Sequence, residues 1–369
     1  MNSTYDTLFA LLRAALHGDE IPKVPNFSVL LQEARKQTVD GLLYALPEIR
    51  VSDEERPVLL QWIAGMPRLE QANREMEMHA VRLSALLERK GVRHAIMKGQ
   101  TCAAHYPHPL LRRSGDIDVY VAPRDFEKAC SALEALQFEK DDVTMHHTSY
   151  RKGSLDIELH WVLQRLQWPS THRKLRELLT EEVDVCEQPT PMQNIGAGDV
   201  HVLPPELNMV LLTAHPFTHI VNEGLGLRQV VDWMMVLQKT RNQINTPKLY
   251  MMLNELRLLR VFRVLAYLCC TYLGMDKDTA CISPDGVAFN KQDGKRGERV
   301  LAWIIESGNF GHAMKFGEGK SRTRRFYSYF LRNCLRFFWL NPTEMIAWPW
   351  MKFYRFVTGQ NHLHDDRIP

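Results

Sequence analysis

The stretch Gly-Asp-Ile-Asp-Val-Tyr-Val at positions 115–121 most constrains the fold of this chain. Its β-branched and aromatic residues predict a strand, in which side chains alternate between two faces. Asp116 and Asp118 therefore point to one side, and the apolar residues point into a core. Two close carboxylates repel unless a cation lies between them, and Mg²⁺ is the usual cation beside phosphates. A solvated strand face is the alternative, because Asp-x-Asp alone is a weak motif.

The elements on both sides of this strand favour the metal site. Upstream, an apolar strand over 93–97 ends in a Lys-Gly turn, and a short helix is expected over 101–106. Downstream, Pro123 opens a helix whose apolar residues recur at helical spacing, and two more strands follow. The resulting order is strand, turn, helix, acidic strand, helix, strand, strand.

A third carboxylate lies on the last of these strands. Asp156, Glu158 and His160 share one face of the segment 155–161, while the residues between them face the core. Glu158, in the middle of the strand, is better placed than Asp156 to join the Asp-x-Asp pair. Three such acids would complete a two-metal site for phosphoryl chemistry. A surface acid on a solvated strand is the alternative for Glu158.

Several short motifs occur along most of the chain. They are Met97-Lys98-Gly99, Leu111-Arg112, Gly115-Asp116-Ile117-Asp118, His146-His147, Ile157-Glu158-Leu159-His160-Trp161, Leu227-Arg228-Gln229-Val230-Val231-Asp232-Trp233 and Gly308-Asn309-Phe310-Gly311. In these motifs the chain resembles a bacterial family of uncharacterised nucleotidyltransferases with a DNA polymerase β-like core. The resemblance implies an α+β fold, in which a small mixed sheet with helices is flanked by N- and C-terminal helical regions. One departure from the wider superfold is Lys98-Gly99-Gln100, where Gly-Gly or Gly-Ser is usual.

The resemblance also implies an activity. A nucleoside monophosphate, with AMP as the expected group, would pass from a nucleoside triphosphate to a hydroxyl, and pyrophosphate would leave. Asp116, Asp118 and Glu158 would be catalytic and would bind Mg²⁺ or Mn²⁺. The acceptor stays open among small molecules, sugars, peptides and proteins.

Five residues are expected to contact the nucleotide: Lys98, Gly99, Arg112, Arg228 and Asp232. Lys98 would pair with the β- or γ-phosphate, and Gly99 would let the backbone approach it. Arg112, in preference to Arg113, would contact the triphosphate or tether the loop to the acids, and a charge-balancing structural pair is an equal alternative. Arg228 and Asp232 are four apart on one expected helix; either could reach the nucleotide, but a structural pair with each other is the favoured interpretation.

Three histidines lie near the predicted acids. His146 and His147 belong to an alternating segment, so only one of them is expected to line the site. A zinc site formed by that residue and His160 lacks a third ligand at a suitable spacing. A polar strand that faces solvent or substrate is therefore the favoured interpretation.

The 369 residues have the composition of an ordinary globular protein, with 45% apolar and 24% charged residues. The net charge of +3 is too weak to indicate nucleic-acid binding. No segment resembles an export signal or a transmembrane helix, so the cytoplasm is the expected location. We expect an N-terminal helical region over 1–90, the α/β core over 91–203, a helical domain over 204–310 and a basic aromatic helical tail over 311–369.

Helical patterns surround the predicted core. Helices are expected over 5–17, 28–44, 67–90, 205–221, 225–239, 247–273 and 297–307. The segment 186–200 is expected to be a connecting loop, and 199–203 could form a small extra strand. The tail interleaves arginines with aromatic residues between 322 and 355, which suits packing on the helical domain, an anionic membrane surface or RNA. Such dense aromatic residues are usually buried, which favours packing. Two other functions stay open: a catalytically silent nucleotide-binding or interaction module, and a membrane-surface partner in an envelope-polysaccharide pathway.

Overall fold

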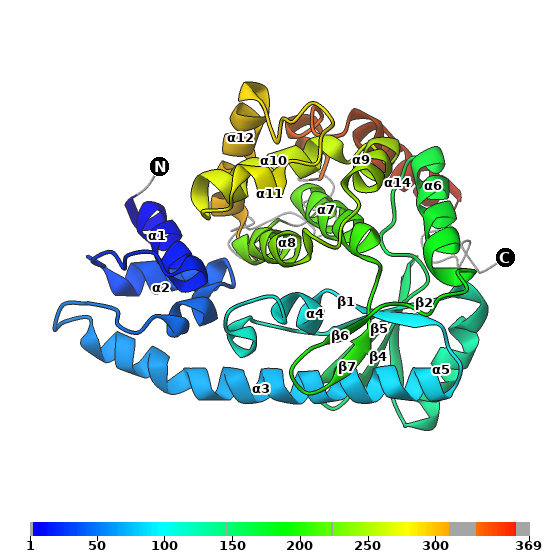
Figure 1. The fold of residues 1–369 in the computed structure, drawn as a ribbon, viewed down its shortest axis with the longest axis horizontal. Coiled ribbons are helices and arrows are strands. Elements are labelled where there is room, and N and C mark those ends of the chain that lie inside the picture. The colour runs from blue at the N-terminus through cyan, green and yellow to red at the C-terminus, as the bar shows by residue number, and fades with distance from the viewer. Residues whose placement is uncertain (1–2, 145, 223, 310–329, 359–369) are drawn as a thin grey trace.

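The structure is a computed structural model that describes residues 3–144, 146–222, 224–309 and 330–358. It is a mixed α+β fold with a five-stranded sheet and many helices, as the sequence predicts at this level (Figure 1). The long helix α3 (Arg56–Arg89) lies on one side of the sheet, and a layer of later helices lies on the other.

The sheet places the predicted acidic strand next to the strand of the third acid. The strands are β1 (His94–Met97), β2 (Ile117–Val121), β3 (Glu139–Val143), β4 (His147–Lys152) and β5 (Leu155–His160). Their order in the sheet is β1-β2-β5-β4-β3. The pair β2 and β5 is parallel, and the other neighbouring pairs of this sheet are antiparallel.

One face of the sheet is apolar and packs on α3 and on α5 (Phe126–Ala135). Ile117, Val119 and Leu159 are at most 1% exposed and belong to one cluster with residues of these two helices. The alternation of apolar and acidic residues in the sequence therefore correctly separates the buried side of β2 from its acidic side.

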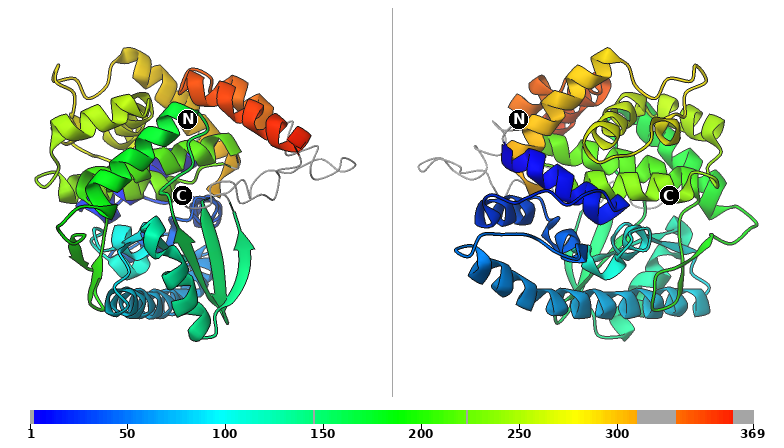
Figure 2. Two further views of the ribbon diagram at one scale, coloured as in Figure 1. Left: turned by 90° about the vertical axis from the view of Figure 1, so that its right-hand side faces the viewer. Right: turned by 60° about the vertical axis from the view of Figure 1, so that its left-hand side comes forward.

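The later helices form a layer over the opposite side of the sheet (Figures 1 and 2). They are α6 (Pro169–Leu179), α7 (Pro205–Asn222), α8 (Leu227–Thr240), α9 (Thr246–Glu255), α10 (Leu259–Tyr272), α11 (Lys277–Ala280), α12 (Lys291–Ser307) and α14 (Pro342–Thr358), with a further helical segment over 330–336. The helices α7, α8 and α10 contact one another, and α8 also contacts α4 (Gly99–Ala103), which follows β1. This layer closes over the acidic side of β2.

The N-terminal helices dock on this later layer. They are α1 (Ser3–His17), α2 (Phe27–Lys36) and the 3-10 helix η1 (Asp40–Ala45). Arg13 donates a hydrogen bond to the carbonyl of Tyr272 at 3.0 Å, and the Gln37 amide donates to the carbonyl of Ile304 at 2.9 Å. Segments far apart in the sequence therefore share one core.

Three helices differ from the sequence-based expectation. The helix expected over 28–44 ends at Lys36, and Asn26 rather than Ser28 caps it, because Asn26 accepts a hydrogen bond from the Val29 amide. The helix expected from Pro67 begins at Arg56 and continues through the proline. The single helix expected over 247–273 is divided into α9 and α10, because Arg257 adopts a left-handed φ of +58°.

Other elements were missed or have different bounds. The helix α6 was missed, and α12 begins at Lys291, six residues before the expected start, behind the N-cap Asn290. The expected loop over 186–200 contains part of a short hairpin: β7 (Asp199–His201) lies within the small extra strand expected over 199–203, and its partner β6 (Met192–Asn194) was not expected. A three-residue strand has no periodicity strong enough to reveal it.

The tail lies only partly within the described residues. Arg322, Arg324, Arg325, Phe326, Tyr327 and Tyr329, together with Phe310 and Gly311 of the Gly-Asn-Phe-Gly motif, lie outside them. Phe330, Phe337 and Trp348 are at most 4% exposed, as the packed interpretation predicts, whereas Trp350 and Phe353 are 65% and 59% exposed. Among the described helices, none combines the length and the apolarity needed to cross a bilayer.

Candidate active site

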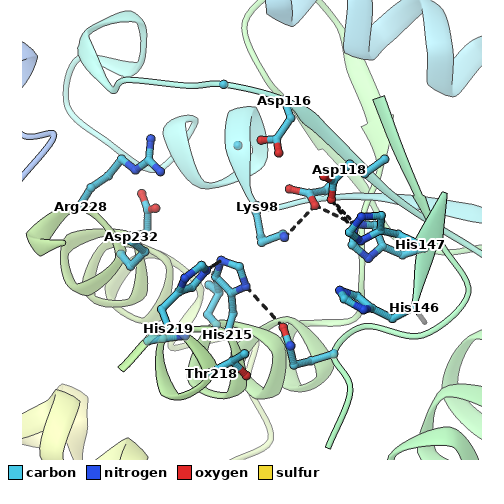
Figure 3. Close-up of a pocket in the computed structure, with 18 of the residues that line it drawn as sticks. Lys98, Asp116, Asp118, His146, His147, His215, Thr218, His219, Arg228 and Asp232 are labelled. Carbon is cyan, nitrogen blue, oxygen red and sulfur yellow. Dashed lines mark hydrogen bonds and ion pairs between the residues drawn. The ribbon is translucent and has the colours of Figure 1, made fainter. Parts of the chain in front are cut away.

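A cavity of about 450 Å³ lies between the acidic side of the sheet and the helices α7 and α8 (Figure 3). It gathers the residues that the sequence assigned to catalysis and nucleotide binding. These are Lys98, Gly99, Arg112, Asp116, Asp118, Glu158, Arg228 and Asp232, and each of them lines the cavity. The structure therefore brings the whole predicted set together, although its members come from segments more than 130 residues apart.

Two carboxylates face the cavity from neighbouring parallel strands. Asp118 of β2 and Glu158 of β5 are register partners, and Asp116 lies one residue before β2 and lines the same cavity. Asp156, the other acid of β5, instead bonds to Arg151 at 2.6 Å and is not among the lining residues. Of the two acids on that strand, Glu158 is the one at the cavity.

The carboxylates change one another's pKa. Repulsion by Asp118, together with burial, raises the pKa of Asp116 to about 6. Burial would also raise the pKa of Asp118, but Lys98 and His160 outweigh it and lower that pKa below its ordinary value. Asp118 therefore keeps its charge, and Asp116 takes up a proton first as the pH falls.

Lys98 joins this cluster through a strained turn. Its ammonium lies 2.7 Å from Oδ1 of Asp118, and although burial opposes the charge, Asp118 and Asp116 raise the pKa of Lys98 above its ordinary value. The backbone of Lys98 has φ +52° and ψ −137°, a conformation that side-chain-bearing residues rarely adopt. At the next residue, a Cβ on Gly99 would lie 3.5 Å from the Asp116 carbonyl oxygen.

His160 connects the two strand carboxylates. Its Nε2 lies 2.9 Å from Oδ1 of Asp118 and 3.2 Å from Oε2 of Glu158. Burial would lower the pKa of His160, but these two carboxylates raise it above the ordinary value. Burial would raise the pKa of Glu158, yet the hydrogen bond with His160 lowers it. The cluster therefore combines three acids with two buried basic groups.

His146 and His147 both line the cavity, so the expectation that only one of them would do so is wrong. His147 begins β4, whereas His146 lies in a bend before it, where the alternation of a regular strand does not apply. Burial and the neighbouring histidines lower the pKa of His146 far below its ordinary value. Burial and His160 lower the pKa of His147 to about 4. Both rings are therefore neutral near pH 7.

The wall opposite the acids belongs to α7 and was not singled out from the sequence. His215, Thr218 and His219 line the cavity from this helix (Figure 3). The Nε2 atoms of His215 and His219 are 3.1 Å apart, and Nδ1 of His215 lies 3.4 Å from Oε1 of Gln164. The four-residue spacing of these histidines in an apolar helix is the signal that could have placed them on one face.

Asp232 bonds to Arg112, so the favoured prediction that Asp232 pairs with Arg228 is wrong. Nε and Nη2 of Arg112 donate to the two carboxylate oxygens of Asp232 at 2.6 and 2.7 Å, and the Tyr106 hydroxyl donates to the same carboxylate at 2.7 Å. The side chains of Arg112 and Asp232 are 5% and 7% exposed. A partner 120 residues away in sequence thus replaces the local i, i+4 pair.

Arg228 is a second guanidinium at the cavity. Its Nη1 donates to the Arg113 carbonyl at 2.8 Å, and within the described part of the chain it forms no ion pair and its Nε has no hydrogen-bond partner. Burial and repulsion from Arg112 lower the pKa of Arg228. A buried cation without a carboxylate partner is costly unless a ligand neutralises it.

The start of α8 holds Arg228 in position. Oε1 of Gln37 accepts a hydrogen bond from the Leu227 amide at 3.0 Å, and the Gln229 amide donates to Oδ1 of Asn309 at 2.9 Å. A Cβ on Gly226 would come within 2.9 Å of the Asn309 side chain, so this close approach requires glycine. Segments before and after the core therefore shape one wall of the cavity.

Comparison with known proteins identifies the family. A sequence model described as uncharacterised nucleotidyltransferase matches residues 24–274, which is more than half of the chain. The chain belongs to this nucleotidyltransferase family. The matched segment contains all eight residues that were predicted for the site, from Lys98 to Asp232.

Other comparisons add little to the family match. Among solved structures, this nucleotidyltransferase chain is similar to an antigenic nucleotidyltransferase-like protein from Paracoccidioides brasiliensis. The identity is 18%, the TM-score is 0.30, and the match covers 45% of this chain and 76% of that chain. A search of curated proteins found no match.

The donor atoms of this nucleotidyltransferase cavity fit a divalent cation. One potential ligand atom from each of Asp118, Glu158 and His160 lies within 4.8 Å of the other two. Asp116 adds a carboxylate whose raised pKa reflects repulsion that a cation would relieve. Carboxylate oxygens are the ligands that Mg²⁺ prefers.

Proposed function

We propose that this nucleotidyltransferase moves a nucleoside monophosphate, AMP in the first instance, from a nucleoside triphosphate to a hydroxyl group and releases pyrophosphate. The observation that carries the proposal is the convergence of Asp116, Asp118 and Glu158 on one cavity, beside Lys98 and Arg228. Acids next to basic groups suit a metal–triphosphate complex, because the acids bind the cation and the basic groups bind the phosphates.

We also propose that the sheet is a DNA polymerase β-like core. The support is the position of the acids on the strands. The Asp-x-Asp pair lies at the start of β2, and the third acid lies on β5, which runs parallel to β2 and pairs Glu158 with Asp118. The turn of Lys98 and Gly99 at the end of β1 faces the same cavity. This is the arrangement that the resemblance led us to expect.

Asp116, Asp118 and Glu158 would hold Mg²⁺ or Mn²⁺. When bound, such a cation neutralises charge on the triphosphate and activates the attacking oxygen. The support in this chain is the raised pKa of Asp116, which has two causes: repulsion by the Asp118 carboxylate and burial. A divalent cation would relieve that repulsion.

The basic groups around the acids would bind the phosphates. Arg228 has no ion pair in the described part of the chain, so a phosphate can serve as its partner. Lys98 offers an ammonium at the same cavity, and Gly99 lets the backbone approach closely. Arg112 and Asp232 form an ion pair with each other, so we assign them to the wall that positions Arg228 and the nucleotide.

In the proposed reaction, the acceptor oxygen forms a bond to the α-phosphorus. The bond from that phosphorus to the oxygen bridging the α- and β-phosphates breaks, and pyrophosphate leaves with the electron pair. Glu158 accepts the proton of the acceptor hydroxyl, because its lowered pKa keeps it a carboxylate at neutral pH. Positioning and charge stabilisation supply most of the rate enhancement in such transfers.

The wall formed by α7 would bind the acceptor. Burial and the charge of Lys98 lower the pKa of His215 well below its ordinary value, so this ring is neutral. A neutral imidazole offers one donor and one acceptor, as do the hydroxyl of Thr218 and the amide of Gln164. Neutral groups of this kind favour an uncharged acceptor with several hydroxyls over an anionic one.

The test is a screen of the four α-labelled nucleoside triphosphates with Mg²⁺ or Mn²⁺, in which pyrophosphate release, labelled protein and labelled sugar acceptors are measured. Wild type should consume ATP, and Asp116→Asn and Asp118→Asn should abolish the transfer. Asp156→Asn is the matched control, because it removes an acid from the same sheet outside the cavity. If both cavity variants retain wild-type turnover, the proposal is wrong. Tight triphosphate binding without turnover would indicate the silent nucleotide-binding module instead.

A further inference from the structure

Three histidine rings meet beside the acids at one end of the cavity. The ring centroids of His146 and His147 are 4.6 Å apart, those of His147 and His160 are 4.8 Å apart, and those of His146 and His160 are 5.6 Å apart. One ring nitrogen of each residue lies within 4.8 Å of the corresponding nitrogens of the other two. The third ligand that the sequence did not reveal is thus the second member of the His146-His147 pair.

The backbone fixes two of these rings on paired strands and the third next to them. His147 of β4 and His160 of β5 are direct register partners in an antiparallel pair. The carbonyl of His146 accepts a hydrogen bond from the Trp161 amide at 3.2 Å, which extends the pairing by one residue. Ligands that lie on regular, paired strands are held more precisely than ligands on loops.

Nitrogen donors remain available in this cluster. Nδ1 of His147 has no hydrogen-bond partner in the part of the chain that the structure describes. His160 is 2% exposed, and its Nε2, which lies 3.2 Å from Oε2 of Glu158, also lies 2.9 Å from Oδ1 of Asp118, so a metal ion at this nitrogen would replace the Asp118 contact. Nδ1 of His146 lies 3.5 Å from the Thr144 hydroxyl, which leaves Nε2 for another partner. A buried nitrogen without a hydrogen-bond partner destabilises the fold, and a bound ligand would remove that cost.

The separations among these donors match a tetrahedral metal. Oε2 of Glu158 lies 3.4 Å from Nδ1 of His147 and 3.2 Å from Nε2 of His160. Ligands about 2.0–2.1 Å from a tetrahedral Zn²⁺ lie about 3.3–3.4 Å from each other. The observed spacings therefore fit two edges of such a site.

We propose that His146, His147 and His160 bind one transition-metal ion, with Zn²⁺ as the physiological occupant and Glu158 as the shared oxygen ligand. Imidazole nitrogens favour Zn²⁺ and its neighbours in the first transition row, whereas Mg²⁺ favours oxygen ligands. This centre is distinct in chemistry from the Mg²⁺ or Mn²⁺ that we assign to the carboxylates, and it does not depend on nucleotidyl transfer.

The test uses Co²⁺ as a spectroscopic probe for the full-length protein after treatment with EDTA, in the presence of excess Mg²⁺ and without nucleotide. Wild type should bind one equivalent with the intense visible absorption of tetrahedral Co²⁺, and one equivalent of Zn²⁺ should displace it. His146→Ala and the milder His147→Gln should each weaken binding at least about a hundredfold, which is more than the loss of an outer-shell partner causes. His215→Ala removes a histidine of the same cavity outside the cluster and should bind Co²⁺ as wild type does.

Three results would overturn the proposal. The first is the absence of Co²⁺ and Zn²⁺ binding in folded wild type, with folding checked by circular dichroism. The second is unchanged binding in both His146→Ala and His147→Gln. The third is equal loss in His215→Ala, which would move the site to α7. Because binding is measured without nucleotide, a protein that binds Co²⁺ but transfers no nucleotide would refute the proposed function and leave this metal centre intact.

Discussion

Asp116→Asn should stabilise the protein when metal is removed. Repulsion by Asp118 and burial raise the pKa of Asp116 from 3.8 to about 6. At 1.36 kcal/mol per pKa unit, the charged form costs about 3 kcal/mol of folding free energy at pH 8. An amide keeps the shape of the side chain and removes its charge. The free energy of unfolding should therefore rise by about 1–3 kcal/mol, where the lower value allows for relaxation around the charged wild-type side chain.

This gain should depend on pH with a definite sign. A carboxyl whose pKa is raised on folding contributes stability that is fully present below the unfolded pKa of 3.8 and is lost as the pH rises through about 6. The Asn variant has no proton to lose there. The gain in unfolding free energy of the Asn variant over wild type should therefore be complete at pH 8 and about half as large at pH 5.

The assay is thermal unfolding in EDTA at pH 5 and pH 8. With an unfolding entropy of about 2.1 cal/mol/K per residue, 3 kcal/mol corresponds to a rise in Tm of about 4 °C for a 369-residue chain. Asp156→Asn is the matched control, since its side chain is 42% exposed and bonded to Arg151. This control should change Tm by about 1 °C or less at either pH.

Two outcomes would refute this reasoning. Asp116→Asn could be less stable than wild type at pH 8, or its advantage could be the same at both pH values. Either result would mean that the two carboxylates do not repel each other as their geometry requires. Addition of Mg²⁺ with triphosphate should reverse the ranking, because wild type gains stability from binding that the variant has lost.

Variants at three further residues test single contacts. Glu158→Gln should reduce turnover far more than triphosphate affinity, and the reasoning fails if Asp156→Asn is the more damaging of the two. Lys98→Ala and Lys98→Gly should both weaken triphosphate binding about ten- to a hundredfold. In urea unfolding, Lys98→Gly should be about 1–3 kcal/mol more stable than Lys98→Ala, because glycine adopts a φ of +52° without strain. Equal stabilities of the two variants would argue against strain. Asp232→Asn leaves Arg112 buried without a carboxylate and should cost about 3–5 kcal/mol in the same assay, and a loss under about 1 kcal/mol would contradict this.

The parts of the fold that the sequence predicted well depend on local patterns. Alternation over 115–121 and 155–161 placed the acids on one side of their strands because the side-chain period of a strand is fixed at two. Nothing in that pattern states which strands are neighbours. The expectation that Glu158 would meet Asp118 came from the resemblance, and the register of β2 and β5 agrees with it.

The parts that the sequence could not predict depend on contacts between distant segments or on single backbone angles. Arg112 reaches Asp232 across 120 residues, so the local spacing of Arg228 and Asp232 gave no sign of it. His146 departs from strand alternation because it precedes the first residue of β4. The break between α9 and α10 depends on one left-handed residue, Arg257, whose side chain does not mark it as a helix end.

Lys98 is the residue at which this chain departs from the wider superfold, and it is also one of the charged residues of the cavity. A glycine at this position would form the turn without strain, so a lysine there requires a compensating gain from its ammonium. In the structure that ammonium neutralises Asp118 at 2.7 Å, as a divalent cation would. Under the proposed function, a cation on Asp118 makes this ammonium redundant there and leaves it free to pair with a phosphate oxygen beside Arg228. The Lys98 ammonium would then contact Asp118 when no metal is bound, as in the structure, and a phosphate when metal and triphosphate are bound, as the sequence predicts. In this way Lys98 would link the binding of the metal to the binding of the triphosphate.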